Sequence, residues 1–309
     1  MNPRNVSRQI TAAFPDVEPR LVLKQPLIIV SAPRSGSNLL FEQLAKIPGF
    51  WTIGGESHAI FRAFPHLRAE NPQLDSGSLD GEHADKETRQ LLRSCFLYLL
   101  RDGRGRVYLS LPASERPPSV CLLEKTPRNA LNIPFLLKVF PDARFIYLHR
   151  EPRQVVASLI EAWTLGLQSG RFKTFQHLPG WDRQGWCFLL PPGWREVRGK
   201  SLAEIAAFQW SASNRIIIEE LASLPVGRWT AVTYEGLVAD PQSALTNICR
   251  FANIEPDQLQ VRSGELPLSG TTITPPAVDK WKRHETEIEA LMPSLAATLE
   301  QIAKSCRDL

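Results

Sequence analysis

The sequence predicts an α/β protein with a central, mostly parallel five-stranded sheet flanked by helices. Short apolar runs of strand length alternate with segments whose apolar residues recur at helical spacing. Polar or basic loops follow these runs, as they do at the carboxyl edge of a parallel sheet. A chain of 309 residues, 43% of them hydrophobic and 22% charged, can bury the core that such a sheet requires. We therefore expect one domain over residues 1–309.

The first strand is predicted at Leu27–Val30, where a β-branched run ends at a loop rich in Pro, Ser and Gly. Helical spacing then begins at Leu39. Such a loop aims backbone N–H groups and the positive end of a helix at one point, which suits a phosphate or sulfate. An ordinary turn with a serine N-cap is the alternative. The candidate anion-binding residues are Arg34, Ser35, Gly36, Ser37 and Asn38.

The second strand is predicted at Phe50–Ile53, and two candidate general bases follow it. Glu56 and His58 are two residues apart, so they share a face in an extended segment. Either could accept the proton of a hydroxyl group, and histidine as a residue type titrates near neutral pH. The residues alone do not decide between them, and a helix cap is the structural alternative for Glu56.

The third strand is predicted at Ser119–Leu123, with Lys125 at its carboxyl end. A lysine there can reach the anion bound by the first loop. Thr126 before Pro127 indicates the start of the next helix. A surface lysine beside that helix is the alternative reading.

The fourth strand, Arg144–His149, leads into a basic loop and a helix. Arg150 stands at the strand end, and Ser158 follows about two helical turns later. A guanidinium fork and a hydroxyl together suit a phosphate group, so a second anion site is predicted beside the first. Arg153 could be a plain surface charge.

The fifth strand is predicted at 228–233, directly before Tyr234. Apolar periodicity predicts helices over 87–101, 201–221 and 244–251, and a charged helix ends the chain.

Three regions fit this pattern less well. Residues 1–25 are expected to form a polar leader with a short helix at most. Residues 62–118 are expected to be a helical insertion that covers the acceptor side of the site. Residues 163–200, rich in Trp, Pro and Gly, are expected to act as a lid, although their tryptophans could equally form a small satellite core.

Composition excludes several classes of function. A net charge of +4 is too small to indicate nucleic-acid binding. The five cysteines contain no C-x-x-C pair, so neither a zinc site nor a disulfide framework is predicted. No stretch approaches 18 apolar residues, and the N-terminus has no apolar signal region. We expect a soluble, cytoplasmic protein without a membrane span.

Several motifs resemble those of bacterial-type sulfotransferases that use PAPS (3′-phosphoadenosine 5′-phosphosulfate). They are P-R-S-G-S at 33–37, K-T-P at 125–127, R-x-P-R-x-x-x-x-S at 150–158 and Y-E-G-L-V-A-D-P at 234–241, in which Gly236 replaces the usual acid. W-S-A-S-N-R at 210–215 resembles the W-x-x-x-N-R helix of bacterial sulfotransferases. D-K-W at 279–281 resembles the signature of the sulfotransferase domains of polyketide-offloading modules, which sulfate a β-hydroxyacyl chain. The chain is also similar to tyrosyl-protein sulfotransferases, although those usually carry a membrane anchor.

This resemblance implies a P-loop-like enzyme that moves the sulfuryl group from PAPS to a hydroxyl of an unidentified small molecule or acyl chain. PAP would be the product, and no metal would be needed. Lys125 would support the transferring group, and Glu56 or His58 would be the general base. Arg150 and Ser158 would hold the 3′-phosphate.

The resemblance also assigns three residues from the second half of the chain. Tyr234 would lie near the nucleotide, Asn214 would line the site, and Lys280 would close over the nucleotide.

Two other functions remain open at this point. A nucleotide-dependent kinase would need the Walker A spacing G-x-x-x-x-G-K-[ST], which the sequence lacks. A non-catalytic nucleotide-binding module would not need Lys125 or the two candidate bases.

Overall fold

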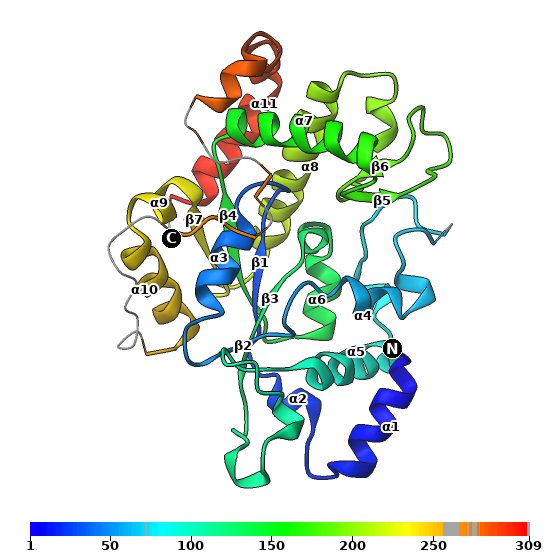
Figure 1. Cartoon of the computed structure of the whole chain (residues 1–309), viewed down its shortest axis with the longest axis vertical. Helices are drawn as coiled ribbons and strands as arrows, with labels where there is room; N and C mark the ends of the chain where they lie inside the picture. The colour runs from blue at the N-terminus through cyan, green and yellow to red at the C-terminus, as the bar shows by residue number, and fades with distance from the viewer. Residues whose placement is uncertain (72, 256–265, 271, 274–276, 278, 308–309) are drawn as a thin grey trace.

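A five-stranded parallel sheet with the strand order β2-β3-β1-β4-β7 forms the centre of the protein (Figure 1). The structure is a computed structural model that describes residues 1–71, 73–255, 266–270, 272–273, 277 and 279–307. The strands are β1 (Leu27–Val30), β2 (Phe50–Trp51), β3 (Cys121–Lys125), β4 (Arg144–His149) and β7 (Trp229–Thr233). Each neighbouring pair is parallel. The predicted α/β class and parallel sheet are confirmed.

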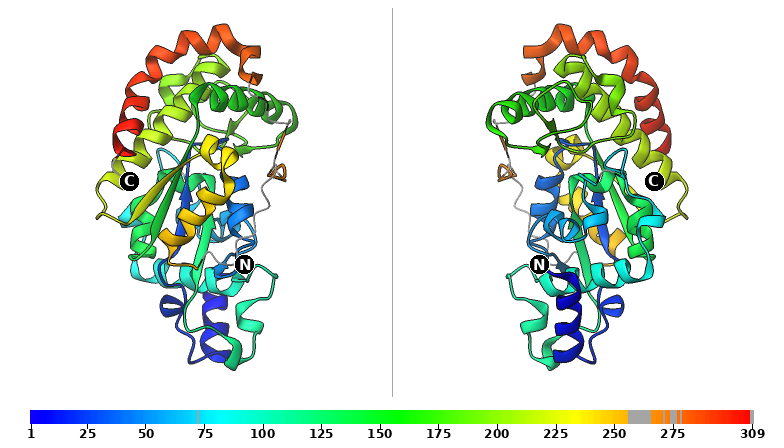
Figure 2. Two further views of the ribbon diagram at one scale, coloured as in Figure 1. Left: turned by 90° about the vertical axis from the view of Figure 1, so that its left-hand side faces the viewer. Right: turned by 90° about the vertical axis from the view of Figure 1, so that its right-hand side faces the viewer.

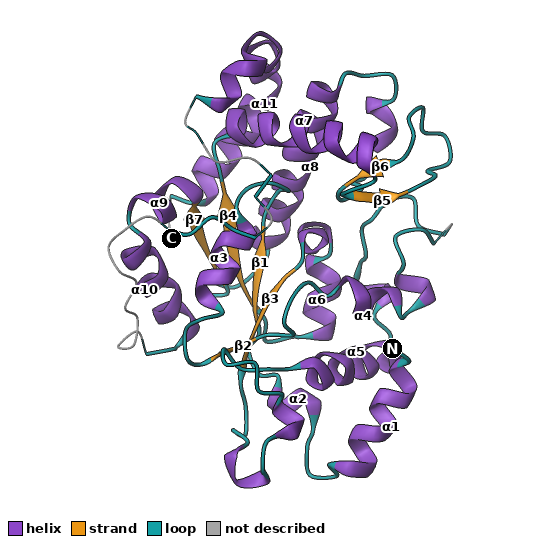
Figure 3. Ribbon diagram, viewed as in Figure 1, coloured by secondary structure: helices purple, strands orange, loops and turns teal. Residues whose placement is uncertain are grey.

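Helices cover both faces of this sheet, as the side views and the colouring by secondary structure show (Figures 2 and 3). One face packs against α3 (Ser37–Leu44), α9 (Tyr234–Ala239) and α10 (Pro241–Ala252). The other carries α5 (Lys86–Leu99), α6 (Ile133–Val139), α7 (Pro152–Ser169), α8 (Leu202–Ala222) and α11 (Glu285–Ser305).

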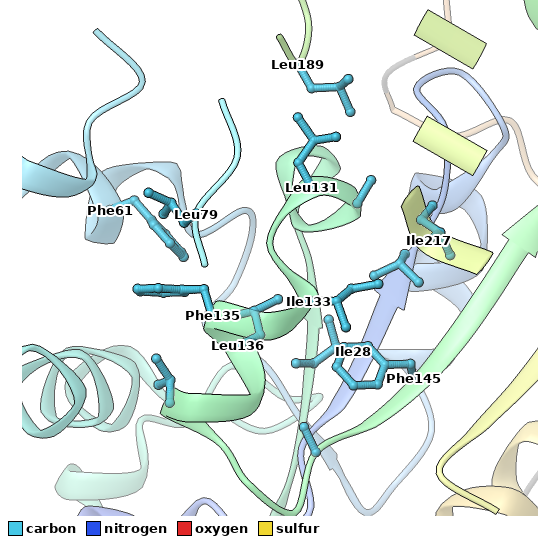
Figure 4. Packing of buried hydrophobic residues seen from close by; sticks show 14 of the residues in the cluster. Ile28, Phe61, Leu79, Leu131, Ile133, Phe135, Leu136, Phe145, Leu189 and Ile217 are labelled. Atoms are coloured by element: carbon cyan, nitrogen blue, oxygen red, sulfur yellow. The ribbon is translucent and has the colours of Figure 1, made fainter. Parts of the chain in front are cut away.

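Strand β1 shows why both faces are covered. Its side chains alternate between the two cores, with Leu27 and Ile29 in one and Ile28 and Val30 in the other. A strand that is apolar on both faces is typical of a parallel sheet between helical layers. Figure 4 shows Ile28 near Phe145 of β4 and Ile133 of α6.

Two strand ends differ from the prediction. Strand β3 includes Glu124 and Lys125, which lie beyond the apolar run, because both side chains are buried and hydrogen-bonded at the strand end. Strand β2 ends at Trp51, because Thr52 forms an isolated antiparallel bridge with Arg101 instead of continuing along β3.

The N-terminal residues form more structure than the short helix expected for 1–25. Helix α1 (Pro3–Ala13) is followed by α2 (Pro19–Val22). Asn2 caps α1 by accepting a hydrogen bond from the backbone N–H of Asn5. Val6 and Ile10, spaced four residues apart, are buried in the main core, and α1 packs against α5.

Residues 163–200 form a small unit with its own core. After α7, the hairpin of β5 (Lys173–Phe175) and β6 (Trp186–Cys187) makes a second, two-stranded sheet. Trp163, Trp186 and Trp194 are buried together, and their rings meet edge to face. The satellite core expected as one alternative is therefore present.

Short helical turns complete the described structure. They are α4 (His58–Arg62), η1 (Pro65–Leu67), η2 (Gly81–His83), η3 (Tyr108–Ser110), η4 (Ala113–Glu115), η5 (Pro127–Leu131), η6 (Trp194–Val197) and η8 (Lys280–His284). Within the described ranges, no helix is both long enough and apolar enough to cross a bilayer.

Candidate active site

A cavity of about 1390 Å³ lies beyond the carboxyl ends of the central strands. Residues that follow each strand contribute to its wall: Arg34 after β1, Glu56 after β2, Arg128 after β3, Arg150 after β4 and Tyr234 after β7. Ligands of open parallel sheets bind at this edge. The topology therefore brings the separate candidate residues of the sequence to one place.

The loop between β1 and α3 is shaped by two residues in the left-handed region. Gly36 has φ 97° and Arg34 has φ 68°. A Cβ atom at Gly36 would lie 2.4 Å from Cδ2 of Tyr234, so glycine lets this ring approach the loop. Gly36, Ser37 and Asn38 line the cavity, whereas Ser35 is 1% exposed and lies behind the wall.

Two arginines and a serine from this set face the same cavity. Nε of Arg34 donates to Oγ of Ser158 at 3.2 Å, which links the first loop to α7. The Arg150 guanidinium lies 4.1 Å from the centre of the Tyr234 ring. Burial lowers the pKa of both arginines, and that of Arg34 is lowered further by the charges of Arg150 and Arg171.

Arg150 also has an unsatisfied donor. Its Nε atom is buried and has no hydrogen-bond partner among the described residues. Buried charges and donors of this kind are costly unless a partner compensates them. The arrangement of Arg34 and Arg150 therefore fits an anion between the first loop and α7.

Glu56 lies between a lysine and a histidine. His58 Nε2 is 3.0 Å from Glu56 Oε2, and Lys125 Nζ donates to Glu56 Oε1 and to Asn38 Oδ1. Burial alone would raise the pKa of Glu56, but the hydrogen bonds and charges of His58 and Lys125 lower it to about 2. Lys125 is 5% exposed and lies behind Glu56 and Asn38 rather than in the cavity wall.

A buried glutamate, which the sequence analysis did not single out, supports this group. Glu124 Oε1 accepts hydrogen bonds from Ser57 Oγ and Thr126 Oγ1, both at 2.7 Å, and Asn129 donates to its other oxygen. The backbone N–H of Ser57 donates to Thr126 Oγ1 at 2.8 Å. This network fixes the segment between Glu56 and His58 to the end of β3. Burial raises the pKa of Glu124.

Lys280 and Asn214 have different positions relative to the cavity. Lys280 lines it and forms an ion pair of 2.5 Å with Glu161 of α7. Asn214 does not line it, so that expectation is wrong. Its side chain is buried in α8, where Oδ1 accepts from Tyr147 at 2.8 Å and Nδ2 donates to the Trp210 carbonyl at 2.8 Å.

The opposite side of the cavity is largely apolar. The hairpin unit contributes Phe172, Phe175, Phe188, Leu189 and Leu190, and η5 contributes Leu131. Of the stretch 62–118, Arg62, Ala69, Glu70 and Gly77 line this side. Helix α5 instead packs against α1, α2 and α6, because its apolar face belongs to the main core. The start of the stretch thus borders the cavity, and its main helix supports the fold.

Comparisons with known proteins found solved structures that are similar to this chain. No curated protein sequence matches the chain significantly. The sulfotransferase domain of the curacin biosynthetic pathway is 22% identical, with a TM-score of 0.44, over 87% of this chain and 98% of that one. A sulfotransferase from Alicyclobacillus acidocaldarius is 13% identical, with a TM-score of 0.49, over 93% and 97%. Mouse sulfotransferase SULT7A1 complexed with PAP is 11% identical, with a TM-score of 0.41, over 92% and 85%.

The match that assigns this chain to a family lies in its sequence. The model of the sulfotransferase family matches residues 26–258. This range contains the β1 loop, the end of β3, the start of α7 and the segment after β7, which are the elements that surround the cavity. The protein therefore belongs to the sulfotransferase family.

Proposed function

We propose that this enzyme transfers the sulfuryl group of PAPS to a hydroxyl group of an acceptor and releases PAP. The contact between Arg34 and Ser158, with Arg150 facing the same cavity, carries the proposal. The two anion sites that the sequence predicts separately are those of the Arg34 loop and of Arg150 with Ser158, and this contact joins residues of both. A bisphosphorylated nucleotide is a ligand that presents two anionic ends to two such sites.

The cavity also has room for two substrates. Its volume of about 1390 Å³ exceeds the 300–1,000 Å³ typical of sites for a single drug-sized ligand. Arg150 and Ser158 would hold the 3′-phosphate, and the loop from Arg34 to Asn38 would hold the phosphosulfate. Tyr234 and Lys280 would border the nucleotide. The apolar side of the cavity would then receive the acceptor.

His58 is the better placed of the two candidate bases. The hydrogen bond with His58 and the charge of Lys125 hold Glu56 ionised, so its affinity for a proton is low. Its other oxygen orients the His58 ring through Nε2, and Nδ1 remains as the nitrogen that can accept a proton. PAPS supplies the activated sulfuryl group. As the acceptor oxygen bonds to sulfur and the bond to PAP breaks, the hydroxyl proton would pass to His58.

The cationic groups would stabilise the charge that develops in this transfer. Arg34 lines the cavity, and Lys125 lies directly behind Asn38 and Glu56. Fixed positive groups of this kind stabilise a transition state because they need little reorganisation. We therefore expect activity to persist in the presence of a chelator.

Titration calorimetry with PAP tests the nucleotide site. Arg34→Ala and Arg150→Ala should each weaken PAP binding by roughly 10- to 100-fold, the loss expected for a charge-assisted hydrogen bond. Arg153→Ala is the matched control, since Arg153 binds Glu289 and Glu151 on the exposed side of α7. Unchanged PAP affinity in both cavity variants would refute the site.

Turnover with labelled PAPS and a panel of hydroxyl acceptors tests the chemistry. The wild-type protein should label at least one acceptor, and His58→Gln should bind PAP normally without turnover. PAP binding without transfer to any acceptor would instead support a non-catalytic nucleotide-binding module.

A further inference from the structure

Arg128 is a half-buried cation in the acceptor side of the cavity wall. It lies on η5, three residues after Lys125. Its Nη2 donates to the Leu67 carbonyl at 3.2 Å, and its guanidinium lies 4.9 Å from the centre of the Phe61 ring. Burial lowers the pKa of Arg128 to about 10, although the charge of Glu70 opposes this shift. The guanidinium is therefore charged at neutral pH in surroundings that disfavour charge.

The structure gives this charge no acidic partner. Among the described residues, no carboxylate oxygen lies within 4 Å of the Arg128 guanidinium, and Glu70 acts only from a greater distance. An arginine offers five N–H donors, and a single carbonyl uses one of them. A charge that is partly removed from water is stabilised by an anionic partner. The Arg128 fork is thus available to an anion in the cavity.

Two lysines around the cavity have counter-charges, whereas Arg62, which is exposed, and Lys173 line the cavity with no carboxylate within 4 Å among the described residues. Lys125 pairs with Glu56, and Lys280 pairs with Glu161. Arg34 and Arg150 have no carboxylate within 4 Å among the described residues, but the phosphates of the proposed nucleotide would supply their counter-charges. Arg128 lies on the acceptor side. Its anion would therefore come from the acceptor.

Apart from Arg62 and Glu70, the wall near Arg128 includes several apolar residues. Leu131, on the same η5 turn, lies near Leu189 of the hairpin unit in Figure 4, and both line the cavity. Phe175 and Phe188 extend this wall. A ligand that satisfies both features needs an anionic group and a hydrocarbon portion.

We propose that the acceptor is an amphiphilic hydroxy compound whose carboxylate or phosphate ester binds Arg128, while its hydrocarbon portion lies against the wall formed by Leu131, Leu189, Phe175 and Phe188. The sulfation of the hydroxyl group rests on the proposed sulfotransfer. The anion site does not depend on that proposal, because it follows from the surroundings of Arg128 alone.

Direct binding measurements test this site without turnover. The probes are β-hydroxylauric acid and ω-hydroxylauric acid, their methyl esters as neutral partners, and ω-hydroxylauryl phosphate. Calorimetry is done with and without saturating PAP. For the wild type, at least one acid or the phosphate should bind about tenfold more tightly than the methyl ester with its hydroxyl at the same position, as a charge-assisted fork predicts. The better anion, carboxylate or phosphate, identifies the headgroup.

Substitutions assign the preference to Arg128. Arg128→Gln should reduce the ratio of anion to ester affinity to within about threefold of unity, while ester binding stays the same. Arg128→Lys, which keeps the charge without the fork, should retain part of the preference. Arg104→Gln is the matched control, since Arg104 is exposed and lies outside the cavity wall.

Two results would overturn the proposal. One is equal binding of anions and esters by the wild type, which decides the matter even if Arg128→Gln fails to fold. The other is that Arg128→Gln and Arg128→Lys each lose anion binding and ester binding to the same extent. Arg128 would then act only by holding the backbone at Leu67 in place. If PAP does not bind the wild type while the anion preference persists, the proposed sulfotransfer fails and the anion site stands.

Discussion

A carboxylate held between a lysine and a histidine determines which proton transfers the cavity can support. The pKa of Glu56 is about 2, below the usual range for glutamate. A lowered pKa means that the carboxylate stabilises the folded protein above the usual glutamate pKa, and that this contribution is lost as the pH falls toward 2. Glu56 therefore stays ionised between pH 5 and 9. A rate change in this range must come from another group.

This difference gives a pH-dependent test of the base. The wild-type kcat/KM should fall at acidic pH, because a protonated base can no longer accept the proton of the acceptor hydroxyl. His58→Gln should lower kcat by about 10²- to 10⁴-fold at every pH, the usual loss of a general base. Steady-state rates from pH 5 to 9, with PAP affinity as the control for folding, check both.

Glu56→Gln separates the base from the group that orients it. The variant should keep the fall in rate at acidic pH and lose part of kcat, because His58 remains but its ring is held less firmly. If Glu56→Gln abolishes turnover while His58→Gln keeps the wild-type pH profile, Glu56 is the base.

Gly36 offers a second test at the scale of one residue. Gly36→Ala would place a Cβ atom 2.4 Å from Cδ2 of Tyr234, at φ 97°. Both the clash and the strained backbone should move the ring and the loop. We therefore expect PAP binding to weaken at least about tenfold and the free energy of unfolding to fall by about 1–3 kcal/mol.

Gly105→Ala is the matched control. Gly105 has φ 81° but open space around it, so this variant should show the strain without the loss of PAP binding.

The candidate residues could be found from sequence because each follows a predicted strand. Parallel strands place their carboxyl ends at one edge, so Arg34, Glu56, Arg150 and Tyr234 were expected together. Glu124 was missed, because an acidic residue at the end of an apolar run suggests a loop. Thr126 is a neighbour in the sequence, but the partner Ser57 comes from a distant segment that no local pattern connects to Glu124.

At the scale of elements, one glutamine joins the hairpin unit to two helices. The Gln209 side chain of α8 accepts from Trp163 Nε1 at 2.8 Å and donates to the carbonyls of Cys187 and Leu189, both at 2.9 Å. It is fully buried. The Gln209 side chain therefore helps, together with the packing of the tryptophans, to hold β6 against α7 and α8.

Gln209→Leu should loosen this unit. It would leave the Trp163 N–H and the Cys187 carbonyl buried without partners, at a cost of about 2–4 kcal/mol. Denaturant unfolding measures that loss. Because the hairpin unit lines the apolar side of the cavity, acceptor binding should weaken more than PAP binding. Gln90→Leu, at an exposed position of α5, should change neither, and equal behaviour of the two variants would contradict this role of Gln209.

Elements that join distant parts of the chain were the least predictable from sequence. The tryptophans of 163–200 allow both a lid and a satellite core, and the ring packing around Trp186 shows the core, while the lid stays a prediction. Helix α5 was expected over the acceptor. Its apolar face instead packs on α1, whose own apolar residues are too few to indicate a core helix from sequence.

For the whole molecule, the sheet separates a ligand-binding end from a supporting end. The carboxyl ends of the strands border the cavity, together with α7. Helix α1 lies at the opposite end of the molecule from α7 (Figures 1 and 2). Stability and ligand binding should therefore respond separately to changes at these two ends.

Ile10→Asp tests this separation. Ile10 is 3% exposed in the main core, so the substitution removes apolar packing and buries a charge, which should cost about 3 kcal/mol or more. For a chain of this size we expect the melting temperature to fall by at least about 5 °C. Gln9→Asp, at the neighbouring exposed position, should leave the melting temperature nearly unchanged.

At a temperature where Ile10→Asp is still folded, its affinity for PAP should match that of the wild type, because no residue of α1 lines the cavity. A loss of PAP affinity in the folded variant would show that α1 and the sheet edge act as one cooperative unit, and that the division between the two ends does not hold.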